Sequence, residues 1–257
     1  MKNKFFNNYS LINIYKNKTH FSGLVTQMLY GEKFKIIKKY GKWWKIKLYQ
    51  DNYQGYILKK KFITKFKYDY KISALKANIY SGPSYNKIIK DKLPFTSQIT
   101  FLEKKGSFIR FEKKKWIRSS DIKKNKYKIK NIFDKIKMFK KVKYLWGGKS
   151  YKGIDCSALI QLFCNFNRMY FPRDSINQQI FIKKKIEIDN IKKNDLLFWK
   201  GHVAIAISTH NLIHAYGPKK NVLIMNIKKT LKIIKKTSNL NLVSIKRFNY
   251  ENFNKRS

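Results

Sequence analysis

Two stretches of the chain follow the same short plan of strands and turns, and this repeat limits the folds open to the first half of the sequence. The first copy, residues 33–57, reads KFKIIKKYGKWWKIKLYQDNYQGYI. The second copy, residues 98–122, reads QITFLEKKGSFIRFEKKKWIRSSDI. Each has a strand, a turn that ends in glycine, an aromatic-led strand and an aromatic-isoleucine pair. Two units of about 50 residues are too few for a solenoid and predict two small β-barrels in tandem.

The repeat and its turn signals give the expected domain boundaries. We expect an N-terminal segment at residues 1–19, a first barrel at 20–66 and a second barrel at 67–124. In the first copy, Phe34 and Ile36 share one face of a strand, and Ile46 and Leu48 share a face of the next. An unrelated β-meander is the alternative for each copy.

From residue 125 the pattern changes to mixed α+β, and we assign residues 125–257 to one domain. Five apolar residues recur at helical spacing within residues 123–142: Ile129, Ile132, Phe133, Ile136 and Phe139. They predict an amphipathic helix that faces the core and has lysines on its outer side. A helix lying on a membrane surface is the alternative. Helices are also expected at 156–167 and 228–236, and strands at 195–200, 202–208, 211–216 and 222–226.

The chain has a formal net charge of +45, with 59 Lys and Arg against 14 Asp and Glu. Such a charge attracts phosphates and is typical of proteins that bind nucleic acid. Lys, Asn, Ile, Tyr and Phe are enriched together, however, and all have A/T-rich codons. The lysines are also spread along the whole length. We therefore expect no obligatory nucleic-acid partner, although acidic small substrates would be drawn to this surface.

The sequence offers little that points to a membrane or to an oxidising compartment. No stretch reaches the roughly 18 apolar residues of a membrane span. The first residues, MKNKFFNNYSLINIYKNKTHFSG, contain no continuous apolar run, so we predict no signal peptide and a cytoplasmic location. Cys156 and Cys164 share one expected helix, where about 12 Å of rise separates them, so both are expected as free thiols.

Cys156 is the best candidate for a nucleophile. Glycines precede it and apolar periodicity begins just after it, which places it at the start of a helix. The unpaired N–H groups and the dipole at a helix N-terminus favour a thiolate, so we expect a lowered thiol pKa. An inert cysteine is the alternative, and Cys164, in the middle of the helix, is expected to be a buried small hydrophobe.

Three of the four histidines follow Cys156, within the segment GHVAIAISTHNLIHAYG, which reads as a hairpin. Ala204 and Ala206 share a face with His202 and leave room for the helix that bears Cys156. If residues that pair across the two strands of this hairpin have numbers with an even sum, His202 and His214 lie on the same face of the sheet. His214 could then orient His202 as a base. His210 falls in the turn and is the alternative orienting residue. The simpler alternative is that both histidines have only a structural role.

These residues resemble a known family. The blocks YLWGGKSYKGIDCSALIQL, FPRDSINQQ, IKKNDLLFWKGHVAIAI and LIHAYG are similar to those of the NlpC-type papain-like cysteine peptidases, which cleave cell-wall peptides. The two β units ahead of them resemble bacterial SH3 domains. The arrangement is most similar to γ-D-glutamyl-L-diamino acid endopeptidases. The fold implied is two all-β SH3-like barrels followed by an α+β papain-like catalytic domain.

The resemblance assigns a role to each matching residue and implies neither a metal nor a cofactor. Cys156 matches the nucleophile, His202 the base and His214 the third polar residue. The matching substrate-binding residues are Tyr144, Asp155, Ser157 and Ser175, with Glu32 and Tyr53 of the first barrel as candidates for closing the amine end of the site. Asp155 could instead be only a helix N-cap. Two positions depart from the family pattern, because Ala158 and Asn194 stand where glycine is usual.

The implied activity is hydrolysis of the γ-D-Glu–diamino acid bond in peptidoglycan stem peptides with a free N-terminal L-Ala, through a cysteine thioester. A peptidoglycan-derived peptide is therefore the expected partner. Three alternatives remain: an exported wall hydrolase, a non-catalytic protein that binds wall peptides or polyanions, and an acyl-transfer enzyme.

Overall fold

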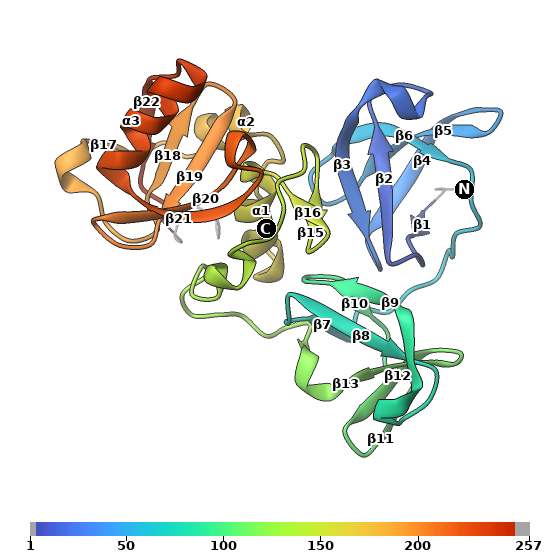
Figure 1. Ribbon diagram of the computed structural model, residues 1–257. Coiled ribbons are helices and arrows are strands. Elements are labelled where there is room, and N and C mark those ends of the chain that lie inside the picture. The colour runs from blue at the N-terminus through green and yellow to red at the C-terminus, as the bar shows by residue number, and fades with distance from the viewer. Residues whose placement is uncertain (1–3, 250–257) are drawn as a thin grey trace. The chain divides into compact units, whose positions relative to one another are not determined.

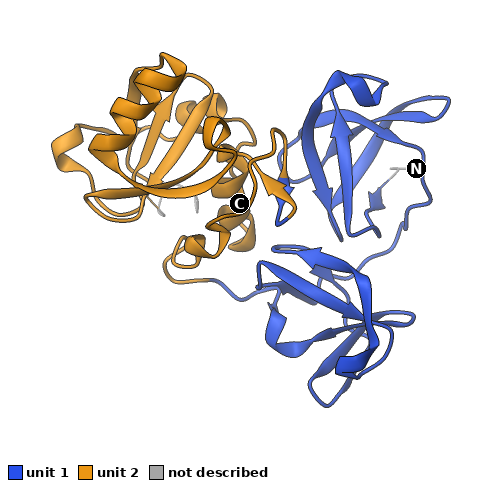
Figure 2. Ribbon diagram, in the orientation of Figure 1, with its two compact units in different colours: residues 1–128, 149–151 blue, residues 129–148, 152–257 orange. Residues whose placement is uncertain are grey.

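The computed structural model describes residues 4–249, which form two compact units (Figures 1 and 2). Of these residues, unit 1 holds 4–128 and 149–151, and unit 2 holds 129–148 and 152–249.

The first β domain of unit 1 is one antiparallel sheet in the order β1-β4-β5-β6-β2-β3 (Figure 1). Its strands are β1 (Phe5–Phe6), β2 (Leu11–Tyr15), β3 (Leu24–Leu29), β4 (Lys33–Tyr40), β5 (Trp43–Leu48) and β6 (Gln54–Leu58). Phe34 pairs with Leu48 across β4 and β5, and Ile36 pairs with Ile46. Phe34, Ile46 and Leu48 are buried in the core and Ile36 packs against it, so the predicted faces are confirmed.

The expected N-terminal segment at residues 1–19 is wrong over its described part. Residues 5–6 and 11–15 are β1 and β2 of the first β domain, and β2 pairs with both β3 and β6. Ile12 and Ile14 of β2 are buried in the same core as Phe34. The pairing with β3 is local, across residues 16–23, whereas the pairing with β6 joins Tyr15 to Tyr56, far along the chain.

The second β domain of unit 1 has two sheets around one core. The first sheet has the order β10-β7-β14 and the second the order β11-β12-β13-β8-β9. The strands are β7 (Tyr70–Ile72), β8 (Lys76–Tyr80), β9 (Ile88–Pro94), β10 (Gln98–Ile99), β11 (Glu103–Lys105), β12 (Phe108–Glu112), β13 (Lys115–Arg118) and β14 (Ile122–Lys124). Ile72 and Ile99 of the first sheet share the core with Leu93 and Ile117 of the second.

The repeat seen in the sequence corresponds to three consecutive paired strands in each β domain. The strands β4, β5 and β6 of the first domain have their counterparts in β11, β12 and β13 of the second. The aromatic-isoleucine pair lies on the last of these strands, and both isoleucines, Ile57 and Ile117, are 0% exposed. The repeat therefore conserves the strand that supplies a core residue.

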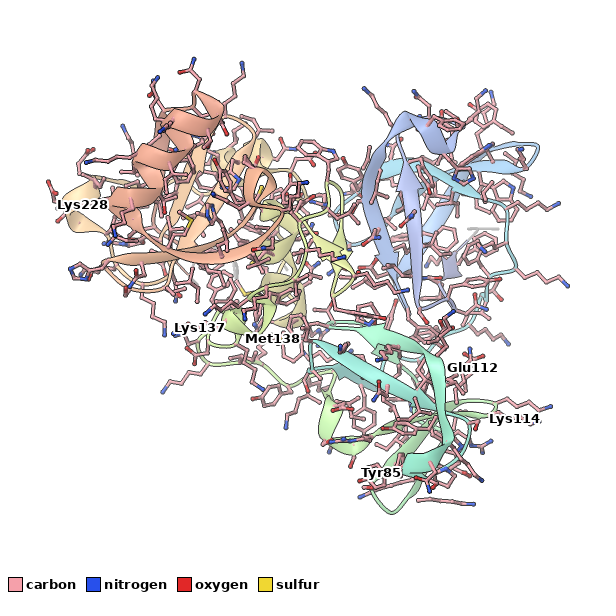
Figure 3. All side chains as sticks on the ribbon, in the orientation of Figure 1. Tyr85, Glu112, Lys114, Lys137, Met138 and Lys228 are labelled. Atoms are coloured by element: carbon pink, nitrogen blue, oxygen red, sulfur yellow. The ribbon has the colours of Figure 1, made fainter. Side chains whose placement is uncertain are left out.

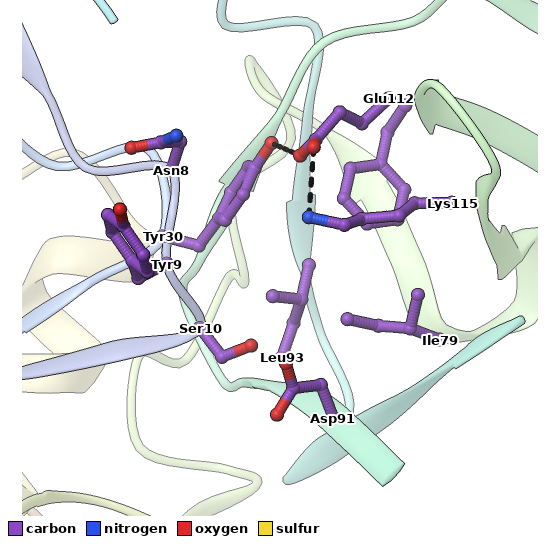
Figure 4. A pocket seen from close by; sticks show the side chains of 10 residues that line it. Asn8, Tyr9, Ser10, Tyr30, Ile79, Asp91, Leu93, Glu112 and Lys115 are labelled. Carbon is purple, nitrogen blue, oxygen red and sulfur yellow. Dashed lines mark hydrogen bonds and ion pairs between the residues drawn. The ribbon is translucent and has the colours of Figure 1, made fainter. Parts of the chain in front are cut away.

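A cavity of about 180 Å³ within unit 1 is lined by residues of both β domains (Figure 4). On one wall the Tyr30 hydroxyl donates to Glu112 at 2.9 Å, and Lys115 forms an ion pair with the same carboxylate at 2.9 Å (Figure 4). Burial raises the pKa of Tyr30, and the Glu112 charge raises it further. Tyr30 follows β3 of the first domain but is buried in the core of the second, so it ties the two β domains together.

Unit 2 is built on one antiparallel sheet in the order β17-β22-β18-β19-β20-β21 (Figure 1). Its elements are β16 (Gly153–Ile154), α1 (Cys156–Phe166), α2 (Ser175–Phe181), β17 (Lys185–Ile186), β18 (Leu196–Trp199), β19 (His202–Ala206), β20 (Asn211–Tyr216), β21 (Asn221–Asn226), α3 (Ile227–Ser238) and β22 (Leu242–Lys246). The short strand β15 (Lys149–Ser150) belongs to unit 1. Helix α1 packs on β19 and β20, and ten of its eleven residues are buried.

The predicted helix over residues 123–142 is wrong. Residues up to Lys124 form β14, and the rest is a chain of turns with one 3₁₀ segment, Ile136–Phe139. Four of the five apolar positions are nevertheless buried as expected: Ile132, Phe133, Ile136 and Phe139 are at most 2% exposed, whereas Ile129 is half-buried. Backbone N–H groups in this segment bond three residues back, as Ile136 does to Phe133. Spacing of three or four residues suits such turns as well as an α-helix. The apolar pattern therefore predicts which residues are buried, but not the backbone conformation of the segment.

The surface of both units carries the excess of lysine. Lys114 in unit 1 and Lys137 and Lys228 in unit 2 are exposed examples (Figure 3). Within residues 4–249, no helix is both long enough and apolar enough to cross a membrane.

Replacing Ile57 with alanine should destabilise unit 1 by about 2–5 kcal/mol, because it leaves a cavity in a closed core. Ile37, on β4 of the same domain and 44% exposed, is the matched control, and Ile37→Ala should change stability by no more than about 0.5 kcal/mol. Urea unfolding followed by tryptophan fluorescence would measure both. Equal effects of the two substitutions would contradict the core described here.

Candidate active site

A tight turn leads into α1. A side chain on Gly148 would lie 2.5 Å from the carbonyl oxygen of Gly153, and one on Gly153 would lie 2.6 Å from Leu145 Cβ. Gly147 has a φ of +71°, which glycine adopts readily. The glycines thus let two chain segments approach closely just before the helix, with Cys156 as the first helical residue.

Asp155 caps α1 and is held in a buried network. Its Oδ1 accepts from the Ala158 N–H at 2.8 Å, and its Oδ2 accepts from the Gly147 N–H at 3.0 Å. Arg173 donates to both carboxylate oxygens, at 3.0 and 2.6 Å. Ser157 donates to Asp155 at 3.2 Å and accepts from Arg173 at 2.9 Å. Asp155 is therefore an N-cap with a fully engaged carboxylate, and its part in binding a substrate amine stays a prediction.

The surroundings of Cys156 raise the pKa of its thiol to about 12. Burial is the largest cause and the Asp155 charge is the second, while hydrogen bonds from the Val203 and Ser157 backbone and the Arg173 charge act the other way. The expectation of a lowered pKa is wrong, because desolvation at this buried position outweighs the helix dipole. The Val203 contact places the thiol beside the residue that follows His202.

His202 and His214 form the pair that the sequence predicted. His202 Nε2 and His214 Nδ1 lie 2.9 Å apart. The pairing of β19 with β20 matches Ile205 to Ile213, an even sum that puts both histidines on one face. Burial lowers the pKa of His202 to about 4 and that of His214 to about 3, the latter helped by His202. Both imidazoles are therefore neutral at pH 7, which suits a base.

The alternative partner His210 lies in the exposed turn, where its Nδ1 contacts the Thr209 hydroxyl at 2.8 Å.

The packing of the two alanines in this hairpin differs from the prediction. Ala204 and Ala206 pack in one cluster with Ile227 and Ile234 of α3, so the helix they make room for is α3 and not the one bearing Cys156.

Tyr144 is half-buried near the nucleophile. Burial raises its pKa, and the Cys156 and Asp155 charges raise it further. Its hydroxyl therefore stays protonated and can donate a hydrogen bond. The ring lies close to Gly217, since a Cβ there would be 3.4 Å from the ring carbon Cε1.

The remaining predicted residues lie on several elements. Ser175 is half-buried and begins α2. Glu32 and Tyr53 belong to unit 1, where Lys149 Nζ contacts Glu32 Oε1 at 2.6 Å in a buried ion pair. Burial raises the pKa of Glu32 despite the opposing Lys149 charge. The substrate contacts proposed for these three residues stay predictions.

Two residues that position the site were quoted in the sequence blocks without a role. Arg173 neutralises Asp155, and Gln178 Nε2 donates to the carbonyls of Ser157 and Pro172 at 3.0 and 2.9 Å. Both are buried, at 3% and 0% exposure. Residues 173–179 read RDSINQQ and are mostly polar, so no local signal marked these two as buried groups that need partners. Asn194 takes the turn as expected, with a φ of +76°.

A helix that begins at a cysteine, packed on a sheet that carries a histidine pair, defines a papain-like cysteine peptidase domain. Residues 141–238 match the NlpC/P60 family, and residues 14–62 match the bacterial dipeptidyl-peptidase SH3 domain. Residues 141–238 are thus an NlpC/P60 cysteine peptidase domain, and an SH3 domain of this bacterial type precedes it in the sequence.

The similar proteins agree with this arrangement. The chain is 25% identical over 232 residues to the gamma-D-glutamyl-L-lysine dipeptidyl-peptidase of Bacillus subtilis (strain 168), covering 80% of this chain and 77% of that protein. It is 43% identical over 72 residues to dipeptidyl-peptidase 6 of Lysinibacillus sphaericus, but this match covers only 28% of this chain and 27% of that protein. The crystal structure of an NlpC/P60 family protein from Bacillus cereus ATCC 10987 covers 95% of this chain and 99% of its own, with a TM-score of 0.79 at 19% identity, and so shares the fold.

Replacing Arg173 with methionine should destabilise unit 2 by about 3–5 kcal/mol, because it leaves the Asp155 carboxylate buried without its cation. Arg118 and Asp121 form a partly exposed pair at 3.9 Å, so Arg118→Met is the matched control and should cost at most about 1 kcal/mol. Urea unfolding followed by circular dichroism would measure both. A loss at Arg173 no larger than at Arg118 would show that Asp155 does not need the ion pair.

Alkylation of Cys156 by iodoacetamide should speed up with pH, by about tenfold per unit between pH 6 and 9, because the thiolate fraction grows as pH approaches the raised thiol pKa. The Cys156→Ser protein gives the background from Cys164. A rate that is constant from pH 5 to 8 would instead mean a preformed thiolate and imidazolium.

Proposed function

We propose that the chain is a cysteine endopeptidase that hydrolyses the γ-D-Glu–diamino acid bond of peptidoglycan stem peptides with a free N-terminal L-Ala. The observation that carries the proposal is the buried 2.9 Å contact of His202 with His214, on the strand whose Val203 backbone bonds to the Cys156 thiol. The relative from Bacillus subtilis, named a gamma-D-glutamyl-L-lysine dipeptidyl-peptidase, supports the choice of bond.

In this mechanism the reaction begins from neutral groups. His202 uses Nε2 for His214, so its Nδ1 is the nitrogen that takes the thiol proton as the Cys156 sulfur attacks the γ-D-Glu carbonyl carbon. The imidazolium then gives that proton to the departing amine of the diamino acid, and a thioester remains. Neutral His202 next takes a proton from water, whose oxygen attacks the thioester and restores the thiol.

The tetrahedral intermediates carry a negative oxygen that needs donors. In α1 the Ala158 N–H already donates to the Asp155 side chain and the Leu159 N–H to the Asp155 carbonyl. The N–H of Cys156, at the first helical position, is the donor that we assign to the oxyanion, with the protonated Tyr144 hydroxyl beside it.

The free amine is the part of the proposal that most needs a test. The Asp155 carboxylate, expected at that end of the substrate, already carries a cation, since Arg173 donates to both of its oxygens. A free amine would therefore meet an ion pair rather than an isolated negative charge. A cytoplasmic role in recycling released wall peptides follows if the free amine is required.

The purified protein should release L-Ala-D-Glu from L-Ala-γ-D-Glu-diaminopimelate, and from the L-lysine form, but not from the N-acetylated peptides. Mass spectrometry of the products gives the readout, and Cys156→Ala, which lacks the nucleophile, should release none.

Two other results would change the proposal in different ways. Equal cleavage of acetylated and free peptides would keep the cysteine chemistry but remove the amine requirement, which favours a wall hydrolase. No cleavage of any of these peptides, with an intact fold, would contradict the proposed activity and favour a binding role.

A further inference from the structure

The second ring nitrogen of His214 has a partner that the mechanism has not used. His214 is 1% exposed, and its Nε2 lies 3.4 Å from the sulfur of Met225. A thioether sulfur can accept a hydrogen bond but has no proton to donate. The contact is therefore satisfied only when His214 carries its proton on Nε2.

The proton on His214 decides what His202 can do. His202 Nδ1 must be unprotonated to accept the thiol proton, so neutral His202 carries its proton on Nε2 and donates it to His214 Nδ1. His214 Nδ1 must then be an acceptor, which leaves Nε2 as its protonated nitrogen. With the opposite tautomer of His214, the pair would force the His202 proton onto Nδ1, where it blocks the base.

The sheet holds Met225 in place for this contact. In the register of β20 with β21, His214 pairs with Leu223 and Leu212 pairs with Met225, so Met225 lies diagonally across from His214 on the same face. Tyr216 stacks on the His214 ring, with centroids 5.0 Å apart and planes 9° apart, and its hydroxyl contacts Thr237 of α3. His202 from β19 and Tyr216 from β20 are thus the titratable neighbours of His214 in these contacts.

We propose that Met225 is a positioning residue for the peptidase reaction, whose thioether accepts from His214 Nε2–H and so selects the tautomer that keeps His202 Nδ1 free. The proposal rests on the cysteine-peptidase function above, but the tautomer can be measured without turnover. Neither the NlpC/P60 match nor the pattern of the sequence singles out this methionine.

Nitrogen NMR of protein labelled in its four histidines tests the tautomer directly. In the wild type, His214 should have a protonated Nε2 and an unprotonated Nδ1 at pH 7. In Met225→Leu, which keeps the volume but removes the sulfur, part of the population should move its proton to Nδ1. A wild-type protein with the proton on Nδ1 would overturn the proposal whether or not the protein cleaves peptides.

Steady-state kinetics provides the second readout. Met225→Leu should lower kcat by roughly fivefold to tenfold, the worth of one neutral hydrogen bond, and leave KM unchanged. Met138→Leu, at a partly buried methionine of unit 2 in the segment before α1 (Figure 3), should leave both unchanged. If Met225→Leu keeps the wild-type tautomer, the proposal is overturned, even if kcat falls.

Discussion

The buried ion pair of Asp155 with Arg173 is the interaction on which the site depends. Removing two charges from water costs several kcal/mol per ion, which only good geometry and further hydrogen bonds offset. Here the Asp155 carboxylate receives five hydrogen bonds, two of them from Arg173. Those bonds fix the Gly147 turn, the first turn of α1 and the Ser157 side chain. The position of Cys156 thus follows from the position of one carboxylate.

Burial then decides the protonation of the catalytic groups. It keeps the Cys156 thiol protonated and both histidines neutral, against the pull of the helix dipole. When the catalytic groups are neutral before the reaction, no ion pair between them can orient the base. Hydrogen bonds must do so: His202 Nε2 contacts His214 Nδ1, and His214 Nε2 contacts the Met225 sulfur, which makes the tautomers part of the chemistry.

Local features of the sequence predicted much of this site, and contacts between distant residues account for the rest. The start of α1 at Cys156 followed from the glycines and the apolar period. The two-residue period of strands allowed the histidine pair, but the register that brings the two histidines together is known only from the structure. The thiol pKa could not be predicted, because it depends on how completely the folded chain covers the sulfur. The strand at residues 11–15 was not predicted because its own pattern is short and one of its two partners, β6, is distant in the sequence.

The lysine excess lies mostly on the surface, and each buried acid has a cation beside it. The three buried acids among residues 4–249 are Glu32, Asp155 and Asp195. Each has a cation within 3.0 Å, from Lys149, Arg173 and Arg247 respectively. A drift toward lysine can therefore proceed at exposed positions, where a charge costs little, while the buried acids stay matched because an unmatched one would cost several kcal/mol. For the same reason, the net charge of +45 says little about the reaction, which is set by the few buried groups that the composition has not altered.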